Sequence, residues 1–327
     1  MKRIIPKNEI IPNYLWHIYA ISNIWAEKKL EYSIKYKSMM SDEDKNLLNE
    51  NRTYLAWGNG RGGVFSGFLF FIPLSFDEMT YEKYLSYLHL LIESVSIGKW
   101  DKFKDKYDFE YDMTNTEFSE PQIEFLRRYL ITIEKYFYDY RDTLWKEHNT
   151  FLNETAVYLI EYFRKLNAVE KWEMYLNKKY PYDEFKIILT VANKNLPSAN
   201  NLSRNRYNFY YQPNSKEELC KFILHEIGTN LLTEELYINY EDKELQGKFI
   251  TDNNLIWQSF EVLAEYCKSK IFKVESDILD GNMFGGGNYY FKDFFDYYET
   301  VNWNNSNIRY SSVMKDAIIY VTSLRDK

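Results

Sequence analysis

The segment 225–230 contains the side chains of this chain that are most able to do chemistry. Its sequence is His-Glu-Ile-Gly-Thr-Asn. A helical His followed by Glu, with a second His four residues after the first, holds zinc through two imidazoles while the Glu accepts a proton from metal-bound water. His225 and Glu226 fit this chemistry, but Thr229 stands at the position of the second imidazole and Asn230 follows it. The segment therefore predicts a metal-binding and proton-accepting pair that lacks one ligand.

A helix is expected to present this pair. Residues 215–218, Ser-Lys-Glu-Glu, form a capping box that starts a helix extending to about Leu232. On a helical wheel the apolar residues gather on one side, and His225 and Thr229 lie nearly opposite them. We therefore expect His225 to face outward, into solvent or a cleft. Asn230 lies about 140° from His225 on an ideal helix, so the two share a metal only through a local bulge or at a frayed end.

A second helix is predicted over about residues 255–272 and contains WQSFEVLAEY at 257–266. Gln258, Glu261 and Glu265 fall on one face of it and form a polar stripe with Lys268. Such a stripe is typical of a solvated face. It is also the surface from which a carboxylate could reach a metal held by the first helix.

The order of elements and two motifs resemble the zincin metallopeptidases of the gluzincin kind. In order, these elements are a strand at 185–191, a strand at 206–212, the capped helix with His-Glu, and the helix with VLAEY. HEIGTN is also similar to the H-E-x-G-T-H motif of the tyrosine carboxypeptidase family that trims tubulin. The resemblance covers residues 185–272. It implies a zincin-like fold, a zinc cofactor and a peptide substrate.

The same resemblance assigns roles by position. His225 corresponds to the first zinc ligand, Glu226 to the general base, and Asn230 to the second His of the five-residue spacing. Matching EVLAEY to E-G-L-A-E-Y makes Glu261 the downstream ligand; other alignments put Gln258 or Glu265 there.

The missing imidazole favours a degenerate site. Asn or Thr oxygen is a poor substitute for imidazole nitrogen, and without bound metal Glu226 has no acidified water to deprotonate. The leading prediction is a pseudopeptidase that binds a peptide or protein partner in a cleft, with the strand ending near Tyr211 as the cleft edge. The alternative is an active zinc peptidase with an atypical ligand set, in which Asn230 or a distant imidazole is the third ligand. The distant candidates are His17, His89 and His148. In a third interpretation, the His-Glu pair is accidental.

Composition excludes several other classes. With 45% hydrophobic and 27% charged residues, the 327-residue chain is typical of a globular protein. A net charge of −7 argues against nucleic-acid binding as its main role. The apolar run at 64–74 is too short to span a bilayer, so no membrane association is expected. Two cysteines, Cys220 and Cys267, favour a reduced, cytoplasmic setting.

The chain is predicted to be α+β. Apolar spacing indicates helices near 14–37, 80–98, 120–148, 150–166 and 168–178, and a glycine turn within 52–74 suggests a hairpin. Ser119 and Gln122 form a capping box. A boundary near residue 180 separates a helical lobe, 1–180, from a zincin-like core, 181–327, with a small sheet and two site helices. The glycine spacing at 58–63 is interpreted as a tight turn, because neither a capped helix nor a V-A-I-K segment follows it.

Overall fold

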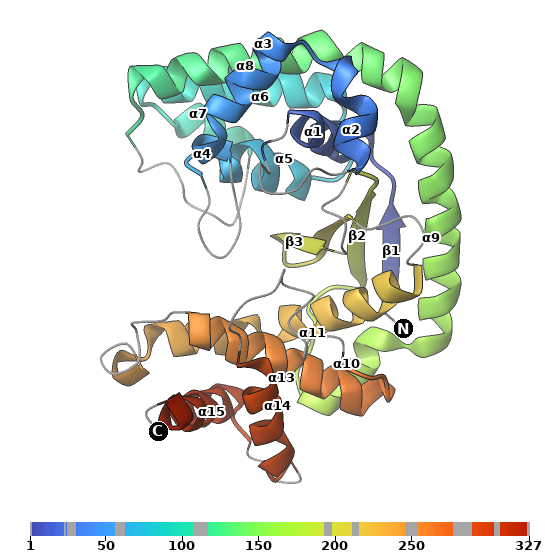
Figure 1. Cartoon of the computed structure of the whole chain (residues 1–327), viewed down its shortest axis with the longest axis vertical. Coiled ribbons are helices and arrows are strands. Elements are labelled where there is room, and N and C mark those ends of the chain that lie inside the picture. Colours follow the sequence, from blue (N-terminus) through green and yellow to red (C-terminus); the bar gives the residue numbers. More distant parts are fainter. Residues whose placement is uncertain are drawn as a thin grey trace. The chain divides into compact units, whose positions relative to one another are not determined.

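The computed structural model describes residues 2–22, 24, 31–55, 63–107, 117–192, 198–210, 216–245, 254–276, 290–303 and 308–325. This part of the chain is mostly helical and includes a four-stranded mixed sheet (Figure 1). The predicted α+β class is confirmed. None of the helices in these ranges is both long and apolar enough to cross a lipid bilayer.

The chain forms two compact units. Unit 1 comprises residues 1–3, 165–183 and 220–327, and unit 2 comprises residues 4–164 and 184–219. This division differs from the single boundary predicted near residue 180. The strands after that boundary belong with the N-terminal helices, because they hydrogen-bond and pack within unit 2.

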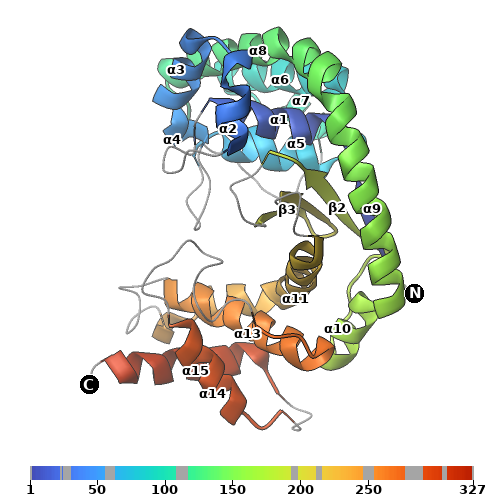
Figure 2. The same cartoon turned by 45° about the vertical axis from the view of Figure 1, so that its right-hand side comes forward.

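Unit 2 is built from many helices. They are α1 (Ile10–Ile21), α2 (Glu31–Tyr36), η1 (Lys37–Met39), α3 (Asp42–Glu50), α4 (Arg52–Leu55), η2 (Gly67–Phe71), α5 (Ile72–Ser75), α6 (Tyr81–Ile97), α7 (Asp101–Lys106), α8 (Glu120–Tyr140), η3 (Arg141–Trp145) and most of α9 (Lys146–Leu166). Helices α1, α5, α6 and α8 lie together on one side of the strands in both views (Figures 1 and 2). The predicted capping box of α8 is confirmed, with the Ser119 amide donating to Gln122 Oε1 at 2.8 Å. The box predicted at 215–218 begins at Ser215, outside the described residues.

The predicted hairpin within 52–74 is wrong. Residues 52–55 are helical, residues 67–71 form a π-helical turn, and α5 follows directly. Phe68, Leu69 and Phe70 are buried in the core. An uninterrupted apolar run buries equally well as a strand or as an interior helix, so its pattern alone does not separate the two. Of the glycine turn at 58–63, all but Gly63 lies outside the described residues.

The sheet has the order β1-β2-β4-β3, with β1 at Arg3–Lys7, β2 at Glu184–Thr190, β3 at Ser198–Ser203 and β4 at Arg206–Tyr210. β2 and β4 pair in parallel, from Lys186 opposite Arg206 to Thr190 opposite Tyr210. β3 pairs antiparallel with β4. The two predicted strands are therefore confirmed, and a third strand, β3, forms between them in the sequence, where no strand was predicted. Because β4 lies between β2 and β3, the prediction that it is the cleft edge is wrong, and Tyr211 itself lies outside the described residues.

Unit 1 consists of α10 (Ala168–Leu176), most of α11 (Lys216–Glu241), α13 (Asn254–Phe272), α14 (Phe291–Thr300) and α15 (Tyr310–Arg325). Helices α13, α14 and α15 lie against one another in both views (Figures 1 and 2). The buried hydroxyl of Tyr298 on α14 donates to Ser259 O at 2.9 Å, and Ser259 Oγ donates to Met314 O of α15 at 3.3 Å. These bonds attach α13 to α14 and α15 at Ser259, two residues before Glu261.

Candidate functional site

Helix α11 carries the His-Glu pair in the middle of 26 continuous helical residues. Its apolar side chains, Leu219, Cys220, Ile223, Leu224 and Ile227, are fully buried. His225 lies on the opposite side but exposes only 1% of its side chain. The prediction that it faces solvent or a cleft is therefore wrong. A helical wheel identifies the polar side of a helix, but it does not reveal that another polar helix covers that side.

Two carboxylates of α13 hold the His225 ring. Its Nε2 lies 2.8 Å from Oε2 of Glu261, and its Nδ1 lies 3.0 Å from Oε2 of Glu265. The two glutamates are one helical turn apart, so one face of α13 presents both to the ring. The predicted meeting of His225 with a side chain from 258–265 is observed. The ligand roles assigned to these residues remain predictions.

Lys268 continues this chain of charges. Its Nζ lies 2.7 Å from Oε1 of Glu265, and their side chains are 1% and 0% exposed. The polar stripe of α13, expected to be solvated, is thus largely buried. Only Glu261 keeps some exposure, at 14% of its side chain. The stripe is buried because opposite charges on it and on α11 compensate one another.

The electrostatics favour a charged imidazole. Burial disfavours the imidazolium, but the hydrogen bonds that its N–H groups donate to Glu261 and Glu265 outweigh this effect and raise the pKa of His225 to about 10. Burial also opposes ionisation of Glu265, yet His225 and Lys268 lower its pKa to about 2. At neutral pH both ring nitrogens of His225 therefore carry a proton, and each N–H donates a hydrogen bond to one carboxylate.

Glu226, the predicted base, lies beside this network. Desolvation raises its pKa to about 7, against the opposing effect of the charge on His225. Thr229 Oγ1 donates to Oε2 of Glu226 at 3.0 Å. The residue at the position of the missing imidazole therefore contacts the predicted base and is itself 5% exposed.

The other predicted ligands lie elsewhere. α11 is α-helical throughout 225–230, so the bulge that would turn Asn230 toward His225 does not occur. Gln258 is buried, and its Oε1 accepts from the Tyr290 amide at 2.7 Å at the start of α14. The geometry thus distinguishes Glu261 and Glu265, which contact His225, from Gln258, which stabilises a neighbouring helix.

The distant histidines belong to unit 2. Nδ1 of His17 is 2.9 Å from the Tyr32 hydroxyl, and Nδ1 of His148 is 3.1 Å from the Tyr140 hydroxyl. His89 is exposed. In the described ranges, no group of three or more His, Cys, Asp or Glu side chains is arranged to hold a metal ion.

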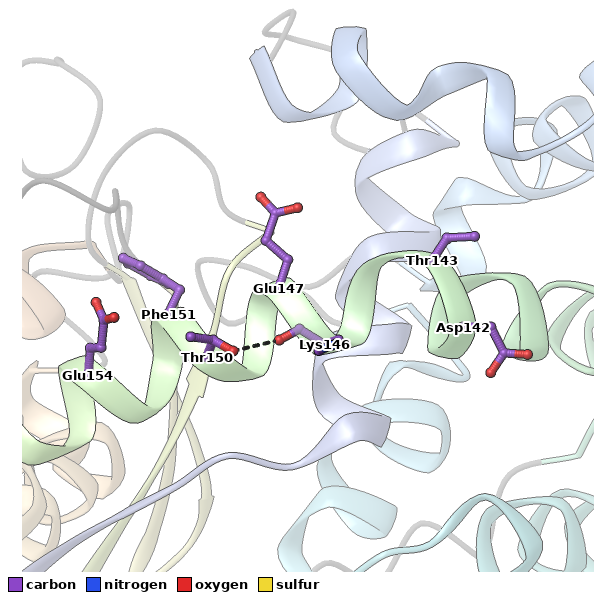
Figure 3. Close-up of a pocket in the computed structure, with 7 residues that line it drawn as sticks. All are labelled: Asp142, Thr143, Lys146, Glu147, Thr150, Phe151 and Glu154. Carbon is purple, nitrogen blue, oxygen red and sulfur yellow. Dashed lines mark hydrogen bonds between the residues drawn. The ribbon is translucent and has the colours of Figure 1, made fainter.

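A surface pocket of about 540 Å³ lies in unit 2. Its lining comes from the continuous helix made by η3 and α9 (Figure 3): Asp142, Thr143, Lys146, Glu147, Thr150, Phe151 and Glu154. The hydrogen bond drawn there, from Thr150 Oγ1 to Lys146 O at 2.9 Å, stays within the helix. The lining mixes both charges and lacks a convergent set of catalytic groups, so we place the candidate site at His225.

The sequence matches no protein-family model and has no match among curated proteins or solved structures. The interpretation of the site consequently depends on its own geometry.

Proposed function

We propose that this chain is a zincin-like pseudopeptidase that binds a peptide or protein partner without hydrolysing it. The observation that carries the proposal is the pair of contacts made around the missing ligand. His225 meets Glu261 through Nε2, while Thr229, at the position of the second imidazole, donates to Glu226. These two contacts support a degenerate zinc site in which part of the ligand set is present and the rest is replaced.

The two nitrogens of His225 support separate roles for the two glutamates. A metal-binding imidazole usually donates its other N–H to a carboxylate, which fixes the orientation of the ring. Glu265 occupies that place at Nδ1, and Glu261 lies at Nε2, where a ligand of the same metal would lie. We therefore assign Glu261 to the ligand position of the resemblance and Glu265 to orienting His225.

The residues present do not fit a resident zinc ion. Zinc in peptidases is held by three protein ligands with water in the fourth position. Here His225 and Glu261 supply two donors. The hydroxyl of Thr229 is a weak ligand and is already bonded to Glu226. Without a third ligand, Glu226 has no metal-bound water from which to take a proton.

A partner in an extended conformation fits this proposal. The strand order ends at β3, so in the described part of the chain its outer edge has no partner strand. An edge strand offers backbone donors and acceptors to an added peptide. The net charge of −7 disfavours a nucleic-acid partner. Cys220 and Cys267 are buried, and two cysteines in 327 residues are too few for a disulfide framework, so we propose a reduced, cytoplasmic setting.

An active zinc peptidase is the second candidate. It is favoured by Glu226, because a carboxyl group with a pKa of about 7 is suited to accept a proton near neutral pH. In that case His225 and Glu261 bind the metal, with Asn230 or an imidazole from elsewhere completing the set.

Zinc content separates the candidates. The protein is purified without chelator, and zinc per chain and peptidase activity are measured for the wild type, His225→Ala, Thr229→His and Asn230→His. We expect little zinc and no activity in the wild type, and about one zinc per chain in Thr229→His, because a helical spacing of four brings both imidazoles to one face. Asn230→His is the matched control, since the continuous helix directs residue 230 elsewhere.

Other results would decide against the proposal. Stoichiometric zinc in the wild type that disappears in His225→Ala, together with peptide hydrolysis, would establish the active enzyme. The absence of zinc from every variant, Thr229→His included, would show that the His-Glu pair is unrelated to a zinc site.

A further inference from the structure

Trp172 of α10 contacts the backbone of α11 beside His225. Its indole is fully buried, and its Nε1 donates to Leu224 O at 2.9 Å. Leu224 is the residue directly before His225. The indole therefore marks one fixed point on the turn that carries the imidazole.

Gly228 provides a second contact on the same face. A Cβ atom built at this position would lie 2.4 Å from Cη2 and 2.5 Å from Cζ2 of Trp172. Such distances are too short for any side chain, so the indole occupies the space that a larger residue would need. Leu224 and Gly228 are four residues apart and lie on one helical face. Two contacts one turn apart fix the rotation of α11 about its axis.

Trp172 also reaches the other site helix. Its ring lies 6.1 Å from that of Phe272 on α13, at an interplanar angle of 62°. Phe272 follows Glu265 and Lys268 at helical spacing, on the face that meets His225. The same indole therefore contacts both helices whose side chains form the ion-pair network.

We propose that Trp172 is a positioning residue that sets the rotation of α11, so that both ring nitrogens of His225 meet the α13 carboxylates. No sequence pattern indicated this role, because Trp172 lies more than fifty positions before His225 along the chain. The inference uses the zinc site of the proposed function only as one of two measurements. The other requires no metal.

The first measurement follows the imidazoles directly. The chain has four histidines, so selective ¹⁵N-histidine labelling resolves each ring by NMR in chelator, with His225→Gln assigning the residue of interest. We expect Trp172→Phe to shift or abolish the His225 ring N–H signals. Trp16→Phe is the matched control, because Trp16 is 1% exposed and lies in unit 2. It should leave those signals in place.

The second measurement uses zinc affinity to report whether the His225 ring is correctly placed. Zinc binding to Thr229→His is compared with binding to Thr229→His/Trp172→Phe, and we expect an affinity about 10- to 100-fold weaker in the double variant. If Trp172→Phe does not fold, Gly228→Ala tests the same contact from the other side. A Gly→Ala change at a solvent-facing helical position would stabilise the helix. Here the methyl group should displace the indole and alter the His225 signals.

The His225 signals could stay unchanged in Trp172→Phe and Gly228→Ala, with equal zinc affinity in the two Thr229→His backgrounds. That result would show that Trp172 only packs against its neighbours and does not position His225. If Thr229→His binds no zinc, the proposed function fails, and the NMR signals still decide the role of Trp172. A change in Trp16→Phe equal to that in Trp172→Phe would also overturn the inference.

Discussion

His225 should make the stability of this protein fall as the pH rises above neutrality. Its pKa is about 10 in the folded chain, against an ordinary value of 6.5. Between these values the folded state keeps a proton that the unfolded state has released. The stabilisation is therefore fully present below pH 6.5 and is lost as the pH rises through 10, at about 1.4 kcal/mol per pH unit. From pH 7 to pH 9 the free energy of unfolding should decrease by about 2.5 kcal/mol.

This window isolates His225 from the other shifted groups. The pKa values of His17 and His148 are lowered to about 3 and about 4, so their linkage to unfolding ends near pH 6.5. Glu226 has a pKa raised to about 7, so its effect on the free energy of unfolding is complete near pH 7, the lower end of this pH range. Burial raises the pKa of Cys267 above its ordinary value of 9.0, so its effect on the free energy of unfolding begins near pH 9, the upper end of this pH range.

The comparison is between the wild type and His225→Gln in urea denaturation at pH 7, 8 and 9, in the presence of chelator. The variant should be about 3–5 kcal/mol less stable at pH 7, because Glu261 and Glu265 then have only the positive charge of Lys268 to compensate both. It should also lose the pH dependence. His148→Gln is the matched control and should keep the decline. Amide exchange of α11 and α13 tests whether unit 1 itself responds.

A wild-type stability that stays flat from pH 7 to pH 9 would refute the charged state of His225. A decline of equal size in His225→Gln would assign the pH dependence to another group.

Three further predictions concern the buried polar groups, and each is tested by urea denaturation. Lys268→Met should lower the free energy of unfolding by about 3–5 kcal/mol, because it strips the cation from a buried pair, whereas Lys270→Met, in an exposed pair, should cost less than about 1 kcal/mol. Similar losses of stability in Lys268→Met and Lys270→Met would show that burial does not determine how much each ion pair contributes to the free energy of unfolding. His17 and His148 stay neutral in the folded chain, so the free energy of unfolding should rise between pH 4 and 6.5. His17→Gln and His148→Gln should each reduce the slope of that rise by up to about 1.4 kcal/mol per pH unit. An unchanged slope would show that the folded state does not hold these rings neutral. Arg206→Met should cost about 3–5 kcal/mol, since this 1% exposed guanidinium pairs with two carboxylates, and a cost under about 1 kcal/mol would contradict the assigned pairing.

Local patterns in the sequence predicted much of the fold. A run of β-branched and aromatic residues located the strand around Ile187, a second strand-like run located the strand around Tyr207, and the Ser119 box located the start of α8. The polar strand β3 was missed because its Asn and Ser residues have low strand propensity, and pairing with β4 overrides that propensity. The helical form of 67–75 was missed because burial on all sides removes periodicity.

The site was predicted in part for a related reason. Helical spacing placed Glu261 and Glu265 on one face of α13, and that face does meet His225. The burial of the stripe was not predictable from either helix alone, because it depends on the two polar faces pairing with each other. Trp172 had no local pattern to mark it, since its role comes from contacts with a helix distant in sequence.

The charges of the network explain how α11 and α13 can pack their polar faces together without a bound metal ion. A zinc ion would compensate the buried charge of Glu261 and its neighbours. In this chain His225 and Lys268 supply two positive charges, which balance those of Glu261 and Glu265. Neither glutamate therefore lacks a compensating cation. These charges stabilise the positions of α11 and α13 without a metal ion, as the proposed binding protein without zinc requires.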